Sequence, residues 1–134
     1  MRKFIIAAHA YFADGLKSGL EMIAGENADV FSVCAYVDDG DFTDKIDTII
    51  ESFDKDDEIL ILTDLFGGSV NNEILGKYDN KNIHLIAGVN LLLAIQLVLG
   101  EQENTTEEFI TESIEQAKGG MVYCNKLKES FDVK

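Results

Sequence analysis

Short runs of apolar residues alternate with amphipathic stretches along the chain. Most of these runs are continuous instead of alternating with polar residues, a pattern typical of strands that are buried on both faces of a sheet. They predict strands over five segments: Lys3–Ala8, Val30–Val37, Glu58–Thr63, Ile83–Ala87 and Met121–Cys124.

The stretches between the runs carry apolar residues at spacings of three and four, as helices with one buried face do. They predict helices over Phe12–Ala24, Phe42–Phe53, Val70–Tyr78, Leu91–Leu99 and Thr106–Lys118. Strands separated by helices of this length form βαβ units around a mainly parallel sheet. The 134 residues contain no proline, repeat or low-complexity linker. We therefore expect one α/β domain over residues 1–134.

Two titratable side chains follow two of the predicted strands. His9 comes directly after Phe4–Ala8, and Asp64 comes directly after the run that ends at Thr63. The carboxyl ends of neighbouring parallel strands lie along one edge of a sheet, where ligands bind. An imidazole that is held by a carboxylate is a common way to prepare a nucleophile or a base. The sequence therefore predicts that His9 and Asp64 meet and carry the chemistry.

The loop after Asp64 is the sharpest local signal in the chain. Gly67 and Gly68 stand between a strand and a helix, where glycine permits backbone angles closed to other residues and lets an anion approach the main chain. Ser69 then opens the helix and is placed to cap it or to donate to a ligand oxygen. A tight turn with a serine cap accounts for the loop equally well. The lysine of a phosphate-binding P-loop is missing.

Composition excludes several classes of partner. The chain has 11 Lys and Arg against 25 Asp and Glu, a formal net charge of −14. Such a charge repels nucleic acid and anionic membranes, and no apolar run has the length of a membrane span. Cys34 and Cys124 lie in strand-like runs and are expected to be buried free thiols, which suits a reducing cytosol. We expect a cytoplasmic protein.

Four segments, in order and at matching spacing, resemble one family, the IIA components of the mannose-type sugar phosphotransferase system. The first strand of that family ends in a phosphorylated histidine, and its third strand runs into an Asp-x-x-Gly-Gly-Ser loop. The matching segments here are Phe4–Ala10, Phe12–Ser18, Asp64–Ser69 and Ile86–Leu91. The resemblance covers essentially the whole chain.

The resemblance implies a fold and an assembly. The fold is a doubly wound α/β sheet of four parallel strands, with Met121–Cys124 as an antiparallel fifth strand and helices on both faces. The assembly is a homodimer in which that last strand pairs with the sheet of the other subunit. The apolar helix Leu91–Leu99 is expected to contribute to the interface.

The resemblance also implies a function. His9 receives a phosphoryl group from the phosphocarrier protein HPr and passes it to a IIB component, which acts with the membrane components IIC and IID on an incoming sugar. Asp64 accepts a hydrogen bond from Nδ1 of His9, and Nε2 takes the phosphoryl group. Ser69 and the backbone around Gly67 and Gly68 hold the phosphoryl oxygens. No metal or other cofactor is implied, because the donor is already a reactive phosphohistidine.

Three alternatives remain at this point. One is a catalytically silent regulatory member of the same family, which the presence of both His9 and Asp64 disfavours. The IIA-like subunit of a dihydroxyacetone kinase system resembles the same family and passes its phosphoryl group to a kinase subunit. A response-regulator receiver carries its phosphoacceptor aspartate after the third strand, where Asp64 stands. A receiver also needs an acidic pair after its first strand to hold magnesium, and here those positions read Ala8, His9 and Ala10.

Overall fold

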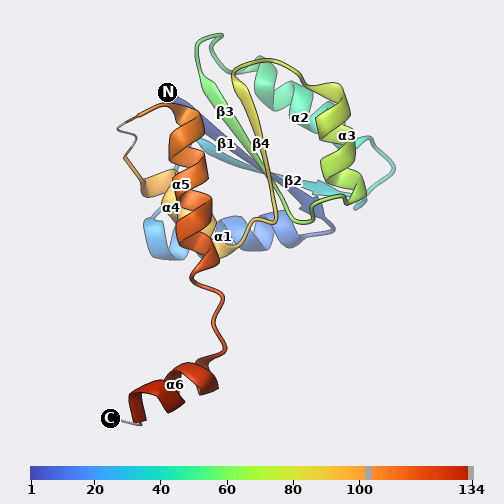
Figure 1. Ribbon diagram of the computed structural model, residues 1–134. Coiled ribbons are helices and arrows are strands. Elements are labelled where there is room, and N and C mark those ends of the chain that lie inside the picture. Colours follow the sequence, from blue (N-terminus) through green and yellow to red (C-terminus); the bar gives the residue numbers. More distant parts are fainter. Residues whose placement is uncertain (102–103, 133–134) are drawn as a thin grey trace. The chain divides into compact units, whose positions relative to one another are not determined.

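The structure is a computed structural model that describes residues 1–101 and 104–132. The chain divides into two compact units, Met1–Leu91 and Leu92–Lys134, which are described separately. The elements along the chain are shown in Figure 1: β1 (Arg2–His9), α1 (Phe12–Ala24), β2 (Val30–Ala35), α2 (Phe42–Glu51), β3 (Glu58–Thr63), α3 (Ser69–Lys77), β4 (Ile83–Ala87), α4 (Leu91–Leu99), α5 (Thr106–Lys118) and α6 (Cys124–Asp132).

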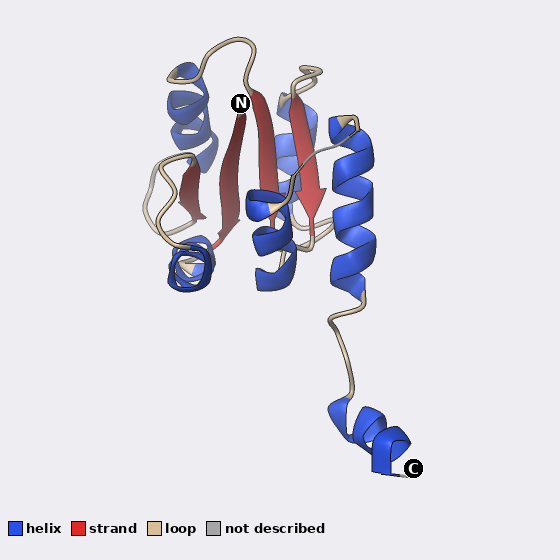
Figure 2. Cartoon of the chain, turned by 90° about the vertical axis from the view of Figure 1, so that its left-hand side faces the viewer, coloured by secondary structure: helices blue, strands red, loops and turns tan. Residues whose placement is uncertain are grey.

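The first unit is built on a four-stranded sheet in the order β2-β1-β3-β4. All three strand pairings are parallel, so the arrows in Figure 2 run to the same edge. In the register of the sheet, His9 of β1 stands opposite Ala35 of β2, and Ala7 stands opposite Thr63, the last residue of β3. The ends of β1, β2 and β3 are therefore neighbours, and the residues that follow them share one site.

Both faces of the sheet are covered by helices, because the buried side chains of each strand alternate between two cores. Ile5 and Ala7 belong to a core on one face, to which α2 and α3 contribute Phe42, Ile46, Val70 and Ile74. The intervening residues of β1 are also buried and point to the other face, where α1 packs along β1 and β2. The predicted parallel sheet with helices on both faces is confirmed (Figure 1).

The caps of two helices follow sequence rules. Asp41 precedes α2, and its carboxylate accepts a hydrogen bond from the Thr43 amide at 2.9 Å. In the second unit, Thr105 precedes α5, and its hydroxyl accepts a hydrogen bond from the Glu108 amide at 3.2 Å. None of the described helices is long and apolar enough to cross a membrane.

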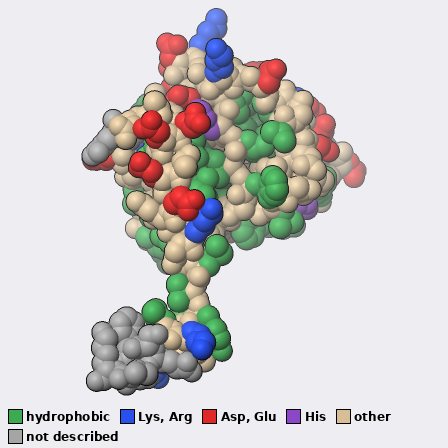
Figure 3. Space-filling model, viewed as in Figure 1, with side chains coloured by type: hydrophobic (Ala, Val, Ile, Leu, Met, Phe, Trp, Pro, Cys, Tyr) green, Lys and Arg blue, Asp and Glu red, His purple; other side chains and the backbone are tan. Residues whose placement is uncertain are grey.

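The fifth strand predicted over Met121–Cys124 is not formed within the chain. Residues 121–123 have no regular secondary structure, and Cys124 begins α6. A strand needs a second backbone to satisfy its N–H and C=O groups, and a short apolar run does not supply one. Met121 and Tyr123 are both 71% exposed, and Figure 3 shows hydrophobic side chains along this segment.

The burial expected for the two cysteines is right for one and wrong for the other. Cys34 lies in β2 and is buried, whereas Cys124 is exposed because its segment is not a strand. Both are free thiols.

A buried hydrogen bond ties the end of β3 to the first turn of α3. The Thr63 hydroxyl donates to Asn71 Oδ1 at 2.7 Å, and the two residues are 0% and 3% exposed. Because Thr63 precedes Asp64 and Asn71 follows Ser69, this bond fixes both ends of the loop between them.

We predict that Thr63→Val lowers the free energy of unfolding by about 1–3 kcal/mol, because it leaves the Asn71 carbonyl oxygen buried without its donor. Thr48→Val is the matched control, since the Thr48 hydroxyl donates to the Asp44 carbonyl on the exposed face of α2. Its cost is expected within about 0.5 kcal/mol. Chemical denaturation measures both values, and equal destabilisation would contradict the role of the buried bond.

Candidate functional site

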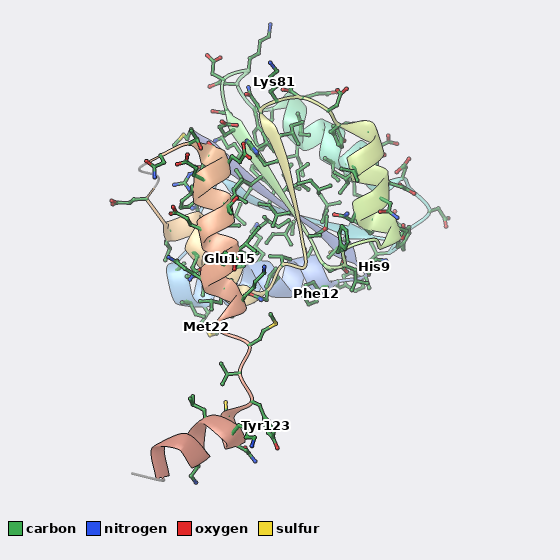
Figure 4. All side chains as sticks on the ribbon, in the orientation of Figure 1. His9, Phe12, Met22, Lys81, Glu115 and Tyr123 are labelled. Atoms are coloured by element: carbon green, nitrogen blue, oxygen red, sulfur yellow. The ribbon has the colours of Figure 1, made fainter. Side chains whose placement is uncertain are left out.

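His9 and Asp64 lie side by side at the carboxyl edge of the sheet. One carboxylate oxygen, Asp64 Oδ2, lies 2.9 Å from His9 Nδ1 and also accepts a hydrogen bond from the His9 backbone amide at 3.0 Å. The prediction that these two residues meet is confirmed. Figure 4 shows His9 at the end of β1, near the start of α3.

The geometry fixes which ring nitrogen carries a proton. An ionised carboxylate only accepts hydrogen bonds, so the neutral imidazole holds its proton on Nδ1 and leaves Nε2 as a lone-pair nitrogen. The His9 side chain is 37% exposed and that of Asp64 is 13% exposed. Nε2 makes no hydrogen bond to a residue in the described part of the chain.

The same hydrogen bonds keep Asp64 ionised. Partial burial alone raises the pKa of the Asp64 carboxyl, but the hydrogen bonds from the His9 amide and ring, together with the positive charge of the ring when it is protonated, outweigh burial and hold that pKa below its ordinary value. The other oxygen, Oδ1, is buried and accepts no hydrogen bond from the described residues. His9 is therefore the principal group that offsets this negative charge.

The two glycines of the loop have separate reasons to be glycine. Gly67 has φ +78°, in the left-handed region that favours glycine. At Gly68 a Cβ would lie 3.0 Å from the Leu65 Cβ and 3.6 Å from His9 Cε1. The Gly68 amide donates to the Leu65 carbonyl at 3.2 Å, so this N–H is occupied within the loop.

The start of α3 is an open set of donors beside the His9 ring. Gly68 is the N-cap, without a side-chain cap, and the first intrahelical bond runs from Asn72 N–H to the Gly68 carbonyl at 2.9 Å. The amides of residues 69–71 therefore have no acceptor within the helix, which is the usual basis of anion binding at a helix start. Asn72 also braces the loop, since its side-chain amide donates to the Gly67 carbonyl at 3.1 Å.

One interpretation of the sequence makes Ser69 the cap of the helix, and this interpretation is wrong. Ser69 is the first residue of α3, and its hydroxyl lies 2.8 Å from the hydroxyl of Tyr36. The Tyr36 ring is also near His9, with the ring centroids 5.6 Å apart. Sequence reasoning placed Tyr36 inside a strand and missed it. Tyr36 stands at the end of β2, on the same sheet edge as His9 and Asp64. This position was the signal in the sequence that could have assigned it to the site.

Two other pairs of titratable side chains lie apart from this set. His84 Nε2 is 3.0 Å from Glu58 Oε2, an ion-pair geometry within the sheet, and Asp38 pairs with Lys45 at 3.0 Å. Among residues 1–101 and 104–132, no group of three or more His, Cys, Asp or Glu side chains is arranged to hold a metal ion.

Comparison with known proteins identifies the family. The model of the EIIA-man family, described as PTS system fructose IIA component, matches residues 3–114. A Klebsiella pneumoniae protein assigned as a permease of the phosphoenolpyruvate-dependent sugar phosphotransferase system has a solved structure that is 38% identical, with TM-score 0.86 over 94% of this chain and 93% of that chain.

Two further solved structures are similar. The phosphotransferase system component EIIA of Streptococcus agalactiae is 31% identical, with TM-score 0.76 over 94% of this chain and 99% of that chain. The mannose/sorbose-specific IIA subunit of Enterococcus faecalis is 25% identical, with TM-score 0.70 over 90% and 92% of the two chains. The chain therefore belongs to the mannose-type IIA component family of the sugar phosphotransferase system.

Proposed function

We propose that this chain is a cytoplasmic phosphoryl carrier that accepts a phosphoryl group from phospho-HPr on His9 and passes it to a IIB component. Through IIB it serves the membrane components IIC and IID in sugar uptake and phosphorylation. The observation that carries the proposal is the state of the His9 ring. One nitrogen is held by an ionised carboxylate, and the other is a lone-pair nitrogen on a side chain that is 37% exposed.

The transfer exchanges one N–P bond for another. The lone pair of His9 Nε2 attacks the phosphorus of the donor phosphohistidine, and the electron pair of the breaking N–P bond returns to the donor ring. The His9 ring gains positive character as the new bond forms, and the Asp64 carboxylate offsets it through the Nδ1 proton. In-line positioning and charge stabilisation are the main requirements of such a transfer, so the step needs no nucleotide or metal.

The start of α3 supplies the second half of the mechanism. The N–H groups of residues 69–71 and the Ser69 hydroxyl are the donors that we assign to the phosphoryl oxygens. Gly67 and Gly68 give the loop its conformation and let the donors approach the His9 ring, since a Cβ at Gly68 would lie 3.6 Å from His9 Cε1. The positive end of the helix dipole favours the incoming anion in a chain whose net charge is −14.

The surface around the site supports a protein donor instead of a free small molecule. Large apolar side chains flank both His9 and Asp64 along the chain and stay exposed: Tyr11 67%, Phe12 47%, Leu65 58% and Phe66 88%. Exposed apolar side chains gathered at one place are typical of a surface that meets another protein.

We also propose that residues 1–134 act as one domain within a homodimer. Within the described sheet, β4 is an edge strand that pairs only with β3, and the outer backbone groups of an edge strand are those to which a further strand can pair. The exposed segment Met121–Cys124 is placed in this proposal against the sheet of the partner subunit. Leu92 and Leu99 of α4 are 39% and 55% exposed, which supports an interface along this apolar helix.

Incubation with phosphoenolpyruvate, enzyme I and HPr is predicted to label the wild-type protein on His9, and His9→Ala is predicted to abolish labelling. His84→Ala is the matched control, because it removes the other histidine, which is paired with Glu58 at the start of β3. Mass spectrometry of the labelled peptides locates the phosphoryl group.

A phosphoryl group on Asp64 or His84 would refute the proposal. The chemical stability of the label gives an independent check, because phosphohistidine survives alkali and is lost in acid. A label that alkali removes would favour the receiver alternative. Transfer onward to a dihydroxyacetone kinase subunit, and not to IIB, would place the carrier in the other pathway.

Asp64→Asn is predicted to slow transfer by roughly tenfold to a thousandfold, since the ring loses the charge that offsets its positive character and selects its tautomer. Asp38→Asn is the matched control: it removes a carboxylate that is paired with Lys45 at 3.0 Å. Quenched-flow measurement of transfer from phospho-HPr compares the two. Similar rates for Asp64→Asn and the wild type would contradict the role of the carboxylate.

The wild-type protein is predicted to be a dimer at micromolar concentration by sedimentation equilibrium. The double variant Val122→Asp/Tyr123→Asp is expected to be monomeric, because neighbouring residues of a strand face opposite sides and one charge meets the partner in either orientation. Met22→Asp, at an 89% exposed position of α1, is the control that stays dimeric. A monomeric wild type would refute the assembly.

A further inference from the structure

One hydroxyl pair joins the ends of two elements beside His9. Tyr36 follows β2, and Ser69 begins α3, so the 2.8 Å contact between Tyr36 OH and Ser69 Oγ links segments that are 33 residues apart. The Tyr36 ring lies beside His9 and packs edge-on against Phe42 of α2, with centroids 5.7 Å apart. Tyr36 thus has a fixed ring and a hydroxyl that is directed at a proposed phosphoryl ligand.

The backbone of Tyr36 is unusual in a way that supports this placement. Its φ is +67°, in the left-handed region that bulky side chains avoid. The preceding residue, Ala35, is held by the sheet, since its carbonyl accepts a hydrogen bond from the Ala10 amide at 2.9 Å. A left-handed residue directly after the strand turns the chain at the edge of the sheet, and Tyr36 is held in that conformation despite its cost.

The chemistry of the two hydroxyls indicates which of them donates the hydrogen bond. A tyrosine hydroxyl is far more acidic than a serine hydroxyl and is the better donor, so the favoured arrangement has Tyr36 O–H donating to Ser69 Oγ. Ser69 then accepts with one lone pair, and its own proton is released toward another acceptor. Hydrogen bonds in such a chain strengthen one another.

The geometry points to Tyr36 as a positioning residue for phosphoryl transfer. It donates to Ser69 and so directs the Ser69 proton to a phosphoryl oxygen on His9. The inference rests on the proposed function, because it concerns the direction of the Ser69 hydroxyl proton toward a phosphoryl group in that same site. It adds a residue from a third strand end to the His9–Asp64 pair and the loop that begins α3.

A different role for Tyr36 makes a different prediction. Tyr36 is 55% exposed, so its ring is also accessible to a partner protein at the edge of the site. If partner contact were its only role, removal of the hydroxyl would change the apparent KM for phospho-HPr. If Tyr36 acts through Ser69, removal of the hydroxyl lowers the maximal transfer rate and leaves the apparent KM within about twofold.

The test is a double-mutant cycle of Tyr36→Phe and Ser69→Ala, with transfer from phospho-HPr as the readout. We expect Tyr36→Phe to lower the maximal rate about fivefold, the effect of one hydrogen bond, and to have no further effect in the Ser69→Ala background. Tyr78→Phe is the matched control, because the Tyr78 hydroxyl donates to the Asp47 carboxylate of α2 and neither residue belongs to the site. Thermal melting verifies that all variants fold.

A second readout does not involve the partner. The ³¹P resonance of isolated phospho-His9 is expected to shift in Tyr36→Phe and in Ser69→Ala, and to stay unchanged in Tyr78→Phe. Three results would each overturn the inference. They are a wild-type maximal rate and ³¹P shift in Tyr36→Phe, an effect of Tyr36→Phe that is confined to the apparent KM, and rate effects of Tyr36→Phe and Ser69→Ala that multiply independently. A wild-type protein that HPr does not label on His9 would instead overturn the proposed function.

Discussion

The site depends on one oxygen atom. Asp64 Oδ2 accepts hydrogen bonds from both the backbone and the ring of His9, so one acceptor fixes the orientation of the imidazole and the position of its proton. This arrangement is possible because β1 and β3 are parallel neighbours that end at the same edge of the sheet. Thr63 directly precedes Asp64, and Asn71 follows shortly after Ser69. The buried hydrogen bond between Thr63 and Asn71 therefore holds the loop that leads into α3 against that edge.

The fold and the central pair could be predicted from the sequence because both depend on local patterns. The bounds predicted for β3, β4, α1, α4 and α5 are those of the structure. His9 and Asp64 could be paired because parallel strands bring their ends together whatever the distance in sequence. Gly67 and Gly68 were recognised because few residues other than glycine suit such a turn, and the structure gives each a separate steric reason.

The parts that could not be predicted depend on contacts that a local pattern does not contain. β2 ends at Ala35, two residues before the predicted end, because Tyr36 adopts a left-handed conformation that apolar periodicity does not reveal. The partner of Ser69 is set by a residue 33 positions away, so the serine looked like a helix cap. The segment Met121–Cys124 has the composition of a strand, but composition does not say whether the edge strand of a sheet is available to pair with it.

The central claim is that Asp64 holds His9 in the tautomer that leaves Nε2 as the nucleophile. The most direct measurement is ¹⁵N NMR of the protein labelled on its histidine rings, before and after phosphorylation by HPr. We expect a protonated Nδ1 and an unprotonated Nε2 in free His9, followed by ¹⁵N–³¹P coupling at Nε2. A proton on Nε2 in the free protein, or coupling to phosphorus at Nδ1, would contradict the central claim.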